Sequence, residues 1–387
     1  MTTVLTPRAL MEKLISFPTV SRESNLDLID FVENYLADHG IDATRVPDPT
    51  GQKAALYAHV GPKVDGGVVL SGHTDVVPVD GQAWDTDPFE VIEANGKYFG
   101  RGTCDMKGFD ALAIWALVEA KQRGVTHPLQ LALSYDEEIG CIGAPPMIDA
   151  MVASGIPRAS SAIIGEPSMM KAVTGHKGAL GFRVHMRGFE VHSSLIHEGV
   201  SAVMFGAKLI DWCNEINAEN AAKAPLEMDA GFVPAYTTLH VGVVTGGTAH
   251  NITAKDCDFV VTFRIVPGET VAHWTERFEA KVAEVQADMQ AIHPDTGIDI
   301  SPTFFVPGLK PEIDGSAEGL VRQLTGDNGV NVVSYGTEAG QFQERGYSAV
   351  ICGPGDIAQA HQPNEFIAIE QFNAGHTFME RLLDHLD

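Results

Sequence analysis

Several features that mark other classes of protein are scarce in this sequence of 387 residues. Its five cysteines are scattered and form no CxxC pair, which excludes a disulfide framework and a zinc-finger pattern. No apolar run approaches the roughly 20 residues of a membrane-spanning helix, so we expect no membrane association. Residues 1–8 lack the basic and apolar regions of a secretion signal, and we therefore expect a cytoplasmic protein.

Positive charge is also scarce, because 26 Lys and Arg stand against 51 Asp and Glu and give a net charge of −25. Nucleic acid and anionic membranes would be repelled, so we expect neither as a partner. The excess of acid favours cationic ligands, although a solvated acidic surface explains it more simply. With 44% hydrophobic residues, the chain is long enough for two domains with separate cores.

Apolar segments alternate with helical patterns through much of the first half of the chain. A helix is predicted at 26–39, where apolar residues recur at helical spacing and Gly40 ends the pattern. Strands are predicted at 54–60, 68–71, 129–135 and 161–164. Such alternation is typical of an α/β fold with a mainly parallel sheet flanked by helices.

The pattern changes after residue 176. Four strands and two helices are predicted there, in the segments 180–186, 202–217, 237–244, 258–266, 271–292 and 298–305. Their βαββαβ order is that of the ferredoxin-like α+β unit. We therefore predict that residues 1–176 and 306–387 form one domain, and that residues 177–305 are a second domain inserted into it.

The sequence Ser-Gly-His-Thr-Asp at 71–75 follows an apolar run and places His73 two residues before Asp75. On an extended chain these side chains point to the same side. Imidazole is the commonest metal ligand, and a carboxylate on its other ring nitrogen orients it. We interpret His73 as a ligand and Asp75 as its orienting partner. Alone the signal is weak, because a single histidine after a buried strand is more often structural.

Acidic side chains recur where further strands or their turns end, at Asp105, Glu137, Glu138 and Glu166, and His361 follows in a Gly- and Pro-rich segment. Ligands bind outside the carboxyl ends of strands in such sheets. Each acid alone is more simply a loop residue or a helix cap, and residues 136–138 resemble a surface charge run. Their recurrence after three apolar strands favours a shared site.

Two histidines and three carboxylates suit two borderline ions such as zinc. Asp105 has two oxygens and can bridge the ions, with His73 and one glutamate completing one site and His361 and another glutamate the second. With Glu138 and Glu166 as these glutamates, Glu137 is then spare. A spare carboxylate next to bound metal is what hydrolysis needs as a general base.

These motifs resemble those of the co-catalytic zinc amidohydrolases and exopeptidases. That family includes aminoacylase, succinyl-diaminopimelate desuccinylase, glutamate-releasing carboxypeptidases and acetylornithine deacetylase. The resemblance covers essentially the whole chain and rests on residues 71–78, 100–108, 137–138, 165–167 and His361. It implies a zinc-exopeptidase-like catalytic domain and an inserted lid and dimerisation domain.

The resemblance also implies a ligand arrangement. Asp105 would bridge two divalent ions, zinc being expected and cobalt able to substitute for it. His73 and Glu166 would complete one site, and Glu138 and His361 the other. The partners implied are a small N-acyl amino acid and a second copy of the chain, as a homodimer.

Further roles are carried over in the same way. Glu137 would be the general base, and the peptide bond between Asp105 and Met106 would be cis. His192 would reach the active site of the partner subunit and stabilise the oxyanion. Asn251 and Arg264 would hold the substrate carboxylate or the oxyanion.

Within the family, residues 102–109, 337–339, and 353–355 with 359–363 resemble the acetylornithine deacetylases most. Glu338 could meet the cationic side chain of ornithine, although a structural hydrogen bond is an equal alternative. We therefore expect hydrolysis of N2-acetyl-L-ornithine to L-ornithine and acetate, as in arginine biosynthesis. The alternatives are a sibling enzyme acting on another N-acyl amino acid or a dipeptide, such as acetylcitrulline or succinyl-diaminopimelate, and an inactive metal-stabilised scaffold.

Overall fold

The computed structural model describes residues 4–387, so the first three residues of the predicted first domain lie outside the described residues. Internal contacts divide the chain into two compact units. The first contains the chain up to Gly175, Pro311–Val332 and Thr337–Asp387, and the second contains His176–Lys310 and Val333–Gly336. The predicted boundaries assign residues 176, 306–310 and 333–336 to the first domain instead. Segment 333–336 belongs to the second unit because Lys177 N–H donates to the Val333 carbonyl.

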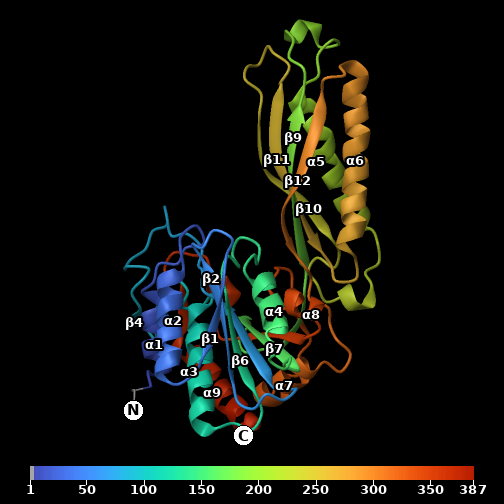
Figure 1. The fold of residues 1–387 in the computed structure, drawn as a ribbon. Coiled ribbons are helices and arrows are strands. Elements are labelled where there is room, and N and C mark those ends of the chain that lie inside the picture. Colours follow the sequence, from blue (N-terminus) through green and yellow to red (C-terminus); the bar gives the residue numbers. More distant parts are fainter. Residues whose placement is uncertain (1–3) are drawn as a thin grey trace. The chain divides into compact units, whose positions relative to one another are not determined.

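The first unit is built on an eight-stranded mixed sheet (Figure 1). In spatial order its strands are β1 (Ala43–Pro47), β2 (Ala54–Val60), β6 (Leu129–Ser134), β3 (Val68–His73), β7 (Ser161–Pro167), β14 (Ser348–Gly353), β8 (Val173–His176) and β13 (Asn331–Val333). The central strands β6, β3, β7 and β14 are parallel, whereas β1, β2 and β8 pair antiparallel with their neighbours. The predicted α/β class is confirmed, and the parallel arrangement holds at the centre.

Helices cover both faces of this sheet, with α3 and α9 on one side and α4 and α8 on the other (Figure 1). The helices of the unit are α1 (Pro7–Ile15), α2 (Leu26–Asp38), α3 (Lys107–Arg123), α4 (Ala144–Ala153), α7 (Ser316–Thr325), α8 (Ala339–Glu344) and α9 (Ile369–Leu386), with the short η3 (Ile357–Gln359). The strands β15 (Phe366–Ala368), β5 (Lys97–Phe99) and β4 (Ile92–Ala94) form a small separate sheet.

Local sequence explains where several of these helices begin and end. Thr6 caps α1 by accepting a hydrogen bond from Ala9 N–H, and Pro7 occupies the first helical position, where no amide donor is needed. Helix α3 ends at Arg123 and is capped by Gly124, whose φ of +73° lies in the left-handed region that favours glycine. Twelve of the first fourteen residues of α3 are buried because the helix packs between the sheet and α9.

The second unit is the predicted βαββαβ arrangement. Its elements are β9 (Gly178–Arg187), η1 (Ser193–Leu195), α5 (Ala202–Ala221), η2 (Glu227–Asp229), β10 (Thr238–Gly246), β11 (Asp256–Ile265), α6 (Val271–Ile292) and β12 (Gly297–Val306). The antiparallel sheet has the order β10-β11-β9-β12, and α5 and α6 pack against it. Buried aromatic side chains such as Phe263, Trp274 and Phe278 form its own core.

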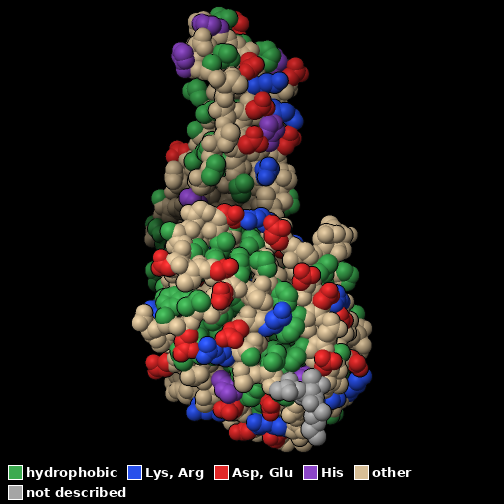
Figure 2. Space-filling view, turned by 90° about the vertical axis from the view of Figure 1, so that its left-hand side faces the viewer, with side chains coloured by type: hydrophobic (Ala, Val, Ile, Leu, Met, Phe, Trp, Pro, Cys, Tyr) green, Lys and Arg blue, Asp and Glu red, His purple; other side chains and the backbone are tan. Residues whose placement is uncertain are grey.

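The distribution of charge and the length of the helices bear on two expectations from the sequence. Figure 2 shows acidic side chains spread over the displayed face rather than gathered in one patch, in keeping with the net charge of −25. Among residues 4–387, every helix is either too short or too polar to cross a bilayer.

Candidate metal centre

The carboxyl ends of three neighbouring parallel strands position the acidic cluster. His73 is the last residue of β3, Glu137 and Glu138 follow β6 within four residues, and Glu166 is the second-to-last residue of β7. Because β6, β3 and β7 are adjacent and parallel, these side chains meet at one edge of the sheet. Asp105 joins them from the turn that precedes α3.

Asp105 lies between the two histidines. Its Oδ1 is 3.0 Å from His73 Nε2, and its Oδ2 is 3.3 Å from His361 Nε2. His361 Nε2 is also 3.0 Å from Glu138 Oε2, and Glu166 Oε1 is 3.7 Å from His73 Nε2. The two oxygens of one carboxylate therefore face two different imidazoles, each of which has a further glutamate beside it.

Asp75 orients His73 differently from the expectation. His73 Nδ1 is 2.9 Å from the main-chain carbonyl of Asp75, whereas the Asp75 carboxylate is 3.6 Å away. The carboxylate instead accepts hydrogen bonds from Ser21 Oγ at 2.7 Å and from the backbone N–H of Glu137 at 3.1 Å. Asp75 therefore fixes the histidine through its backbone, and its side chain ties the end of β3 to the turn after β6.

The charges of the cluster call for additional cations. Asp105, Glu137, Glu138 and Glu166 are four largely buried carboxylates with two imidazoles among them. Burial raises the pKa of Glu166 and of Glu138, and nearby carboxylates raise both further. Buried charges need partners or metal ions. This donor set of imidazoles and carboxylates fits divalent ions of the zinc type.

Distance alone groups the ligand atoms in a second way. His73, Asp105 and Glu138 lie close enough to share one ion, and so do His73, Glu137 and Glu166. His361 is missing from both groups, and Glu137 appears as a ligand instead of a base. We prefer the arrangement in which each oxygen of Asp105 faces a different ion, because it assigns one imidazole to each ion.

Glu137 has an additional contact that the sequence did not suggest. The thiol of the buried Cys141 donates to Glu137 Oε1 at 3.1 Å. Burial raises the pKa of Glu137 to about 8, and neighbouring carboxylates add to the shift while His73 opposes it. A carboxyl with a pKa near neutrality suits a general base that both takes and returns a proton. Only the spacing of four residues after Glu137 could have drawn attention to Cys141.

Comparison with known proteins identifies the family. Residues 69–385 match the model of the peptidase family M20/M25/M40. The chain belongs to this family. It is a metal-dependent amidohydrolase, and the cis peptide bond between Asp105 and Met106, which the resemblance implies, is confirmed.

Curated relatives of this M20 protein are named acetylornithine deacetylase. One from Myxococcus xanthus is 33% identical over 98% of this chain and 97% of its own length. One from Pasteurella multocida is 31% identical over 96% and 95%, respectively. Both relatives are thus similar to this chain along nearly its whole length.

Solved structures share the fold at low sequence identity. An M20 family metallo-carboxypeptidase from Sulfolobus solfataricus covers 98% of both chains with a TM-score of 0.79 at 17% identity. A dinuclear metal-binding M20 peptidase from Bacillus subtilis covers 98% of this chain and 97% of its own with a TM-score of 0.65 at 14% identity. These likenesses support the M20 fold.

Glu338 lies in a different setting from the metal cluster. It is 1% exposed, and its two carboxylate oxygens accept hydrogen bonds from the hydroxyls of Ser71 and Ser134, the latter at 2.8 Å. These serines belong to β3 and β6, and Glu338 immediately precedes α8. The arrangement favours a structural hydrogen bond over a contact with the ornithine side chain.

The remaining predicted residues belong to the second unit. His192 and Asn251 lie in adjacent loops, because Ser193 N–H donates to the Asn251 carbonyl at 2.9 Å. Arg264 is on β11 opposite Ala179, near the start of β9, whereas the two loops lie beyond the other end of that strand. The eight steps between residues 179 and 187 span roughly 26 Å of strand. Within one unit, Arg264 is therefore remote from His192 and Asn251.

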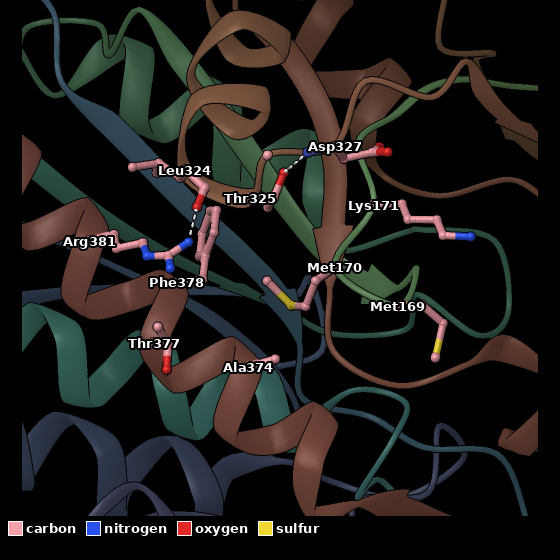
Figure 3. A pocket seen from close by; sticks show the side chains of 11 residues that line it. Met169, Met170, Lys171, Leu324, Thr325, Asp327, Ala374, Thr377, Phe378 and Arg381 are labelled. Carbon is pink, nitrogen blue, oxygen red and sulfur yellow. Dashed lines mark hydrogen bonds between the residues drawn. The ribbon is translucent and has the colours of Figure 1, made fainter.

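A cavity elsewhere in the first unit is not the metal site. Figure 3 shows its walls, in which Arg381 of α9 donates to the Leu324 carbonyl at 2.7 Å. Its volume is about 450 Å³, and it is lined by Met169, Met170, Lys171, Leu324, Thr325, Gly326, Asp327, Ala374, Thr377, Phe378 and Arg381. No residue of the acidic cluster lines it, so its size has no bearing on the chemistry of the M20 site.

Proposed function

We propose that this enzyme hydrolyses N2-acetyl-L-ornithine to L-ornithine and acetate and so supplies ornithine for arginine biosynthesis. The placement of Asp105 between His73 and His361, with Glu137 beside them, supports amide hydrolysis at a pair of ions. The names of the full-length relatives support the choice of substrate. A cytoplasmic location stays a prediction from the sequence.

The residues that would hold each ion are those that lie near one of the two oxygens of Asp105. His73 and Glu166 would complete one site, and His361 and Glu138 the other, with zinc as the expected metal and cobalt as a substitute. When bound, such ions polarise the amide carbonyl and lower the pKa of a nearby water. The main-chain carbonyl of Asp75 would keep Nε2 of His73 as the ligating nitrogen, since Nδ1–H is its donor.

Glu137 would move the proton. Its carboxylate would take a proton from the attacking water and return it to the nitrogen of the leaving amine. The Cys141 thiol, which donates to Glu137 Oε1, would hold this carboxylate in place between the two transfers. Burial raises the pKa of Glu137, which favours the uptake of a proton from water.

His192 would stabilise the oxyanion. Its Nδ1 accepts a hydrogen bond from the Ser194 backbone N–H at 3.3 Å, so the neutral ring carries its proton on Nε2. An N–H donor that is fixed in this way suits a developing negative charge. Asn251, in the adjacent loop, would assist it, and Arg264 would bind the substrate carboxylate through its bidentate guanidinium.

The separation within the second unit supports a homodimer. One copy of this unit has Arg264 roughly 26 Å along the sheet from the loops of His192 and Asn251, which is too far for one small substrate. In a dimer, all three residues would reach one substrate if His192 and Asn251 came from the partner subunit and Arg264 from the same chain as the metal site. Strand β10 lies at the sheet edge and carries Val243 and Val244, 73% and 47% exposed, which supports association with a second copy.

The alternative substrate class is favoured by the burial of Glu338. Because both carboxylate oxygens accept hydrogen bonds from serine hydroxyls, Glu338 has no free oxygen with which to select a cationic side chain. A related deacylase or dipeptidase acting on another N-acyl amino acid, such as acetylcitrulline or succinyl-diaminopimelate, is therefore the second candidate.

A substrate panel tests the proposal. We expect kcat/KM for N2-acetylornithine to exceed that for acetylmethionine, acetylcitrulline, succinyl-diaminopimelate and simple dipeptides. Active protein should contain close to two ions per chain, and chelation should abolish turnover. Equal efficiencies across the acetylated amino acids would make it a broad deacylase, and full activity with one ion would remove the bridging role of Asp105.

A further inference from the structure

Glu365 is a buried carboxylate that holds the turn containing Asp105. It is 1% exposed, and its Oε1 accepts three backbone hydrogen bonds, from Gly102 and Cys104 at 3.0 Å and from Asp105 at 3.1 Å. Three amides that converge on one oxygen fix the path of the chain into Asp105. Because Glu365 follows His361 by four residues, it also fastens the His361 segment to this turn.

Arg101 extends these contacts toward a second loop. It is fully buried, and its Nη1 donates to Glu365 Oε2 at 2.6 Å. Its Nη2 donates to Gln82 Oε1 at 2.7 Å, and the indole of Trp84 donates to the same oxygen at 3.1 Å. A buried guanidinium paired on two sides in this way sets the relative positions of its partners.

Gln82 completes the connection to His361. Its amide Nε2 donates to the main-chain carbonyl of His361 at 2.9 Å. The side chain of His361 is 51% exposed, and its φ of +62° lies in the left-handed region that non-glycine residues rarely adopt. The position of this imidazole is therefore determined by its backbone contacts more than by packing around the ring.

The connections run from one metal ligand to another. They link the Asp105 amide through Glu365, Arg101 and Gln82 to the His361 carbonyl. His73 and Glu166 lie instead on β3 and β7, where the sheet hydrogen bonds hold the backbone.

We propose that Glu365, Arg101 and Gln82 are positioning residues that set the spacing of Asp105 and His361. They thereby tune the ion affinity of the site formed by Asp105, Glu138 and His361, and leave the His73 site nearly unaffected. This inference rests on the ion pair of the proposed function. A purely structural role would instead destabilise the whole unit and weaken both sites.

The test is a titration of metal-free protein with Zn²⁺ against a competing chelator, which gives two stepwise dissociation constants. The main variant is Gln82→Met, because Gln82 is half-buried and methionine keeps its length while removing the amide. Glu365→Gln is the second variant. Gln52→Met, on an exposed side chain of the same unit, is the matched control. Melting temperature of the metal-free proteins is measured alongside.

In Gln82→Met, we expect one of the two dissociation constants to rise by roughly 10- to 100-fold, as when partners of metal ligands are removed. The other constant and the melting temperature should stay near those of Gln52→Met. Glu365→Gln should show the same selective loss with a lower melting temperature, because Arg101 loses its charged partner.

Two results would overturn the inference while leaving the proposed function standing. In one, folded Gln82→Met binds both ions as the parent does. In the other, both dissociation constants rise together and the melting temperature falls in parallel. A parent protein that binds only one ion at saturation would overturn the ion pair itself, and the inference with it.

Discussion

At the scale of single residues, the glutamates of the first unit differ in what their oxygens contact. Glu137 accepts one hydrogen bond from a thiol and lies among other carboxylates, so it is free to exchange a proton. Glu338 accepts two from serine hydroxyls, and Glu365 accepts three from backbone amides. Only the first pattern is typical of a side chain that exchanges a proton. The other two are typical of side chains that hold neighbouring segments in place.

Replacing Glu137 by glutamine should remove the proton carrier and keep the shape. We expect kcat to fall by roughly 10²- to 10⁴-fold, with metal content and melting temperature close to those of the parent. Steady-state kinetics with elemental analysis of the same preparation checks this. Activity within a few-fold of the parent would exclude Glu137 as the base.

Replacing Glu338 by glutamine should affect stability more than specificity. The loss of charge-assisted hydrogen bonds to Ser71 and Ser134 should lower the free energy of unfolding by about 1–3 kcal/mol. The ratio of kcat/KM for acetylornithine to that for acetylmethionine should not change. Urea unfolding and the two kinetic measurements decide this, and a collapse of the ratio would restore the role in substrate selection.

At the scale of elements, the site depends on strands that end close to a helix. Helix α3 begins just after Asp105 and packs against β3, β6 and β7, from whose ends the other ligands project. Close approach requires small residues. A Cβ added to Gly165, the residue before Glu166, would lie 2.1 Å from ring atoms of Phe109.

Gly165→Ala should therefore force apart β7 and Phe109 of α3. We expect a loss of about 1–3 kcal/mol in the free energy of unfolding, together with reduced activity because Glu166 moves. A smaller partner, Phe109→Leu, in the double variant should restore part of the activity. Gly319→Ala in α7, where an added Cβ has open space, is the control and should be neutral or slightly stabilising. Additive losses in the double variant would argue against the steric explanation.

At the scale of the whole molecule, the chain builds two compact units and distributes the predicted functional residues between them. The acidic cluster and Glu137 lie in the first unit, and His192, Asn251 and Arg264 lie in the second. The separation of Arg264 from the other two along β9 and β11 supports the proposal, first implied by the family resemblance, that two copies of the chain contribute to one active site.

Mixed dimers test that assignment. His192→Ala and Glu137→Gln should each be nearly inactive, and after subunit exchange an equimolar mixture should recover about a quarter of the parent activity. Half of the dimers would then be hybrids, each with one intact site out of two. Each variant subjected to the same exchange alone is the control. Verified exchange without recovery would mean that His192 acts within its own chain or has no catalytic role.

The sequence by itself determined the alternation of elements, the βαββαβ insert and the identity of the clustered acids and histidines. These follow from local periodicity, and from the rule that ligands gather at the carboxyl ends of parallel strands. Asp105 and His361, 256 positions apart by subtraction of their residue numbers, were predicted together because a shared ion needs both imidazole and carboxylate ligands.

Only the tertiary structure decided what the remaining polar residues do. The same residue type, a glutamate near a turn, accepts hydrogen bonds from a thiol, from serine hydroxyls or from backbone amides, according to which donors approach it in the fold. Glu365 meets Arg101 and Glu338 meets Ser71 across more than 260 positions of sequence. Hydrogen-bond partners that are so distant leave no local pattern, since periodicity reports burial and not the identity of the neighbour.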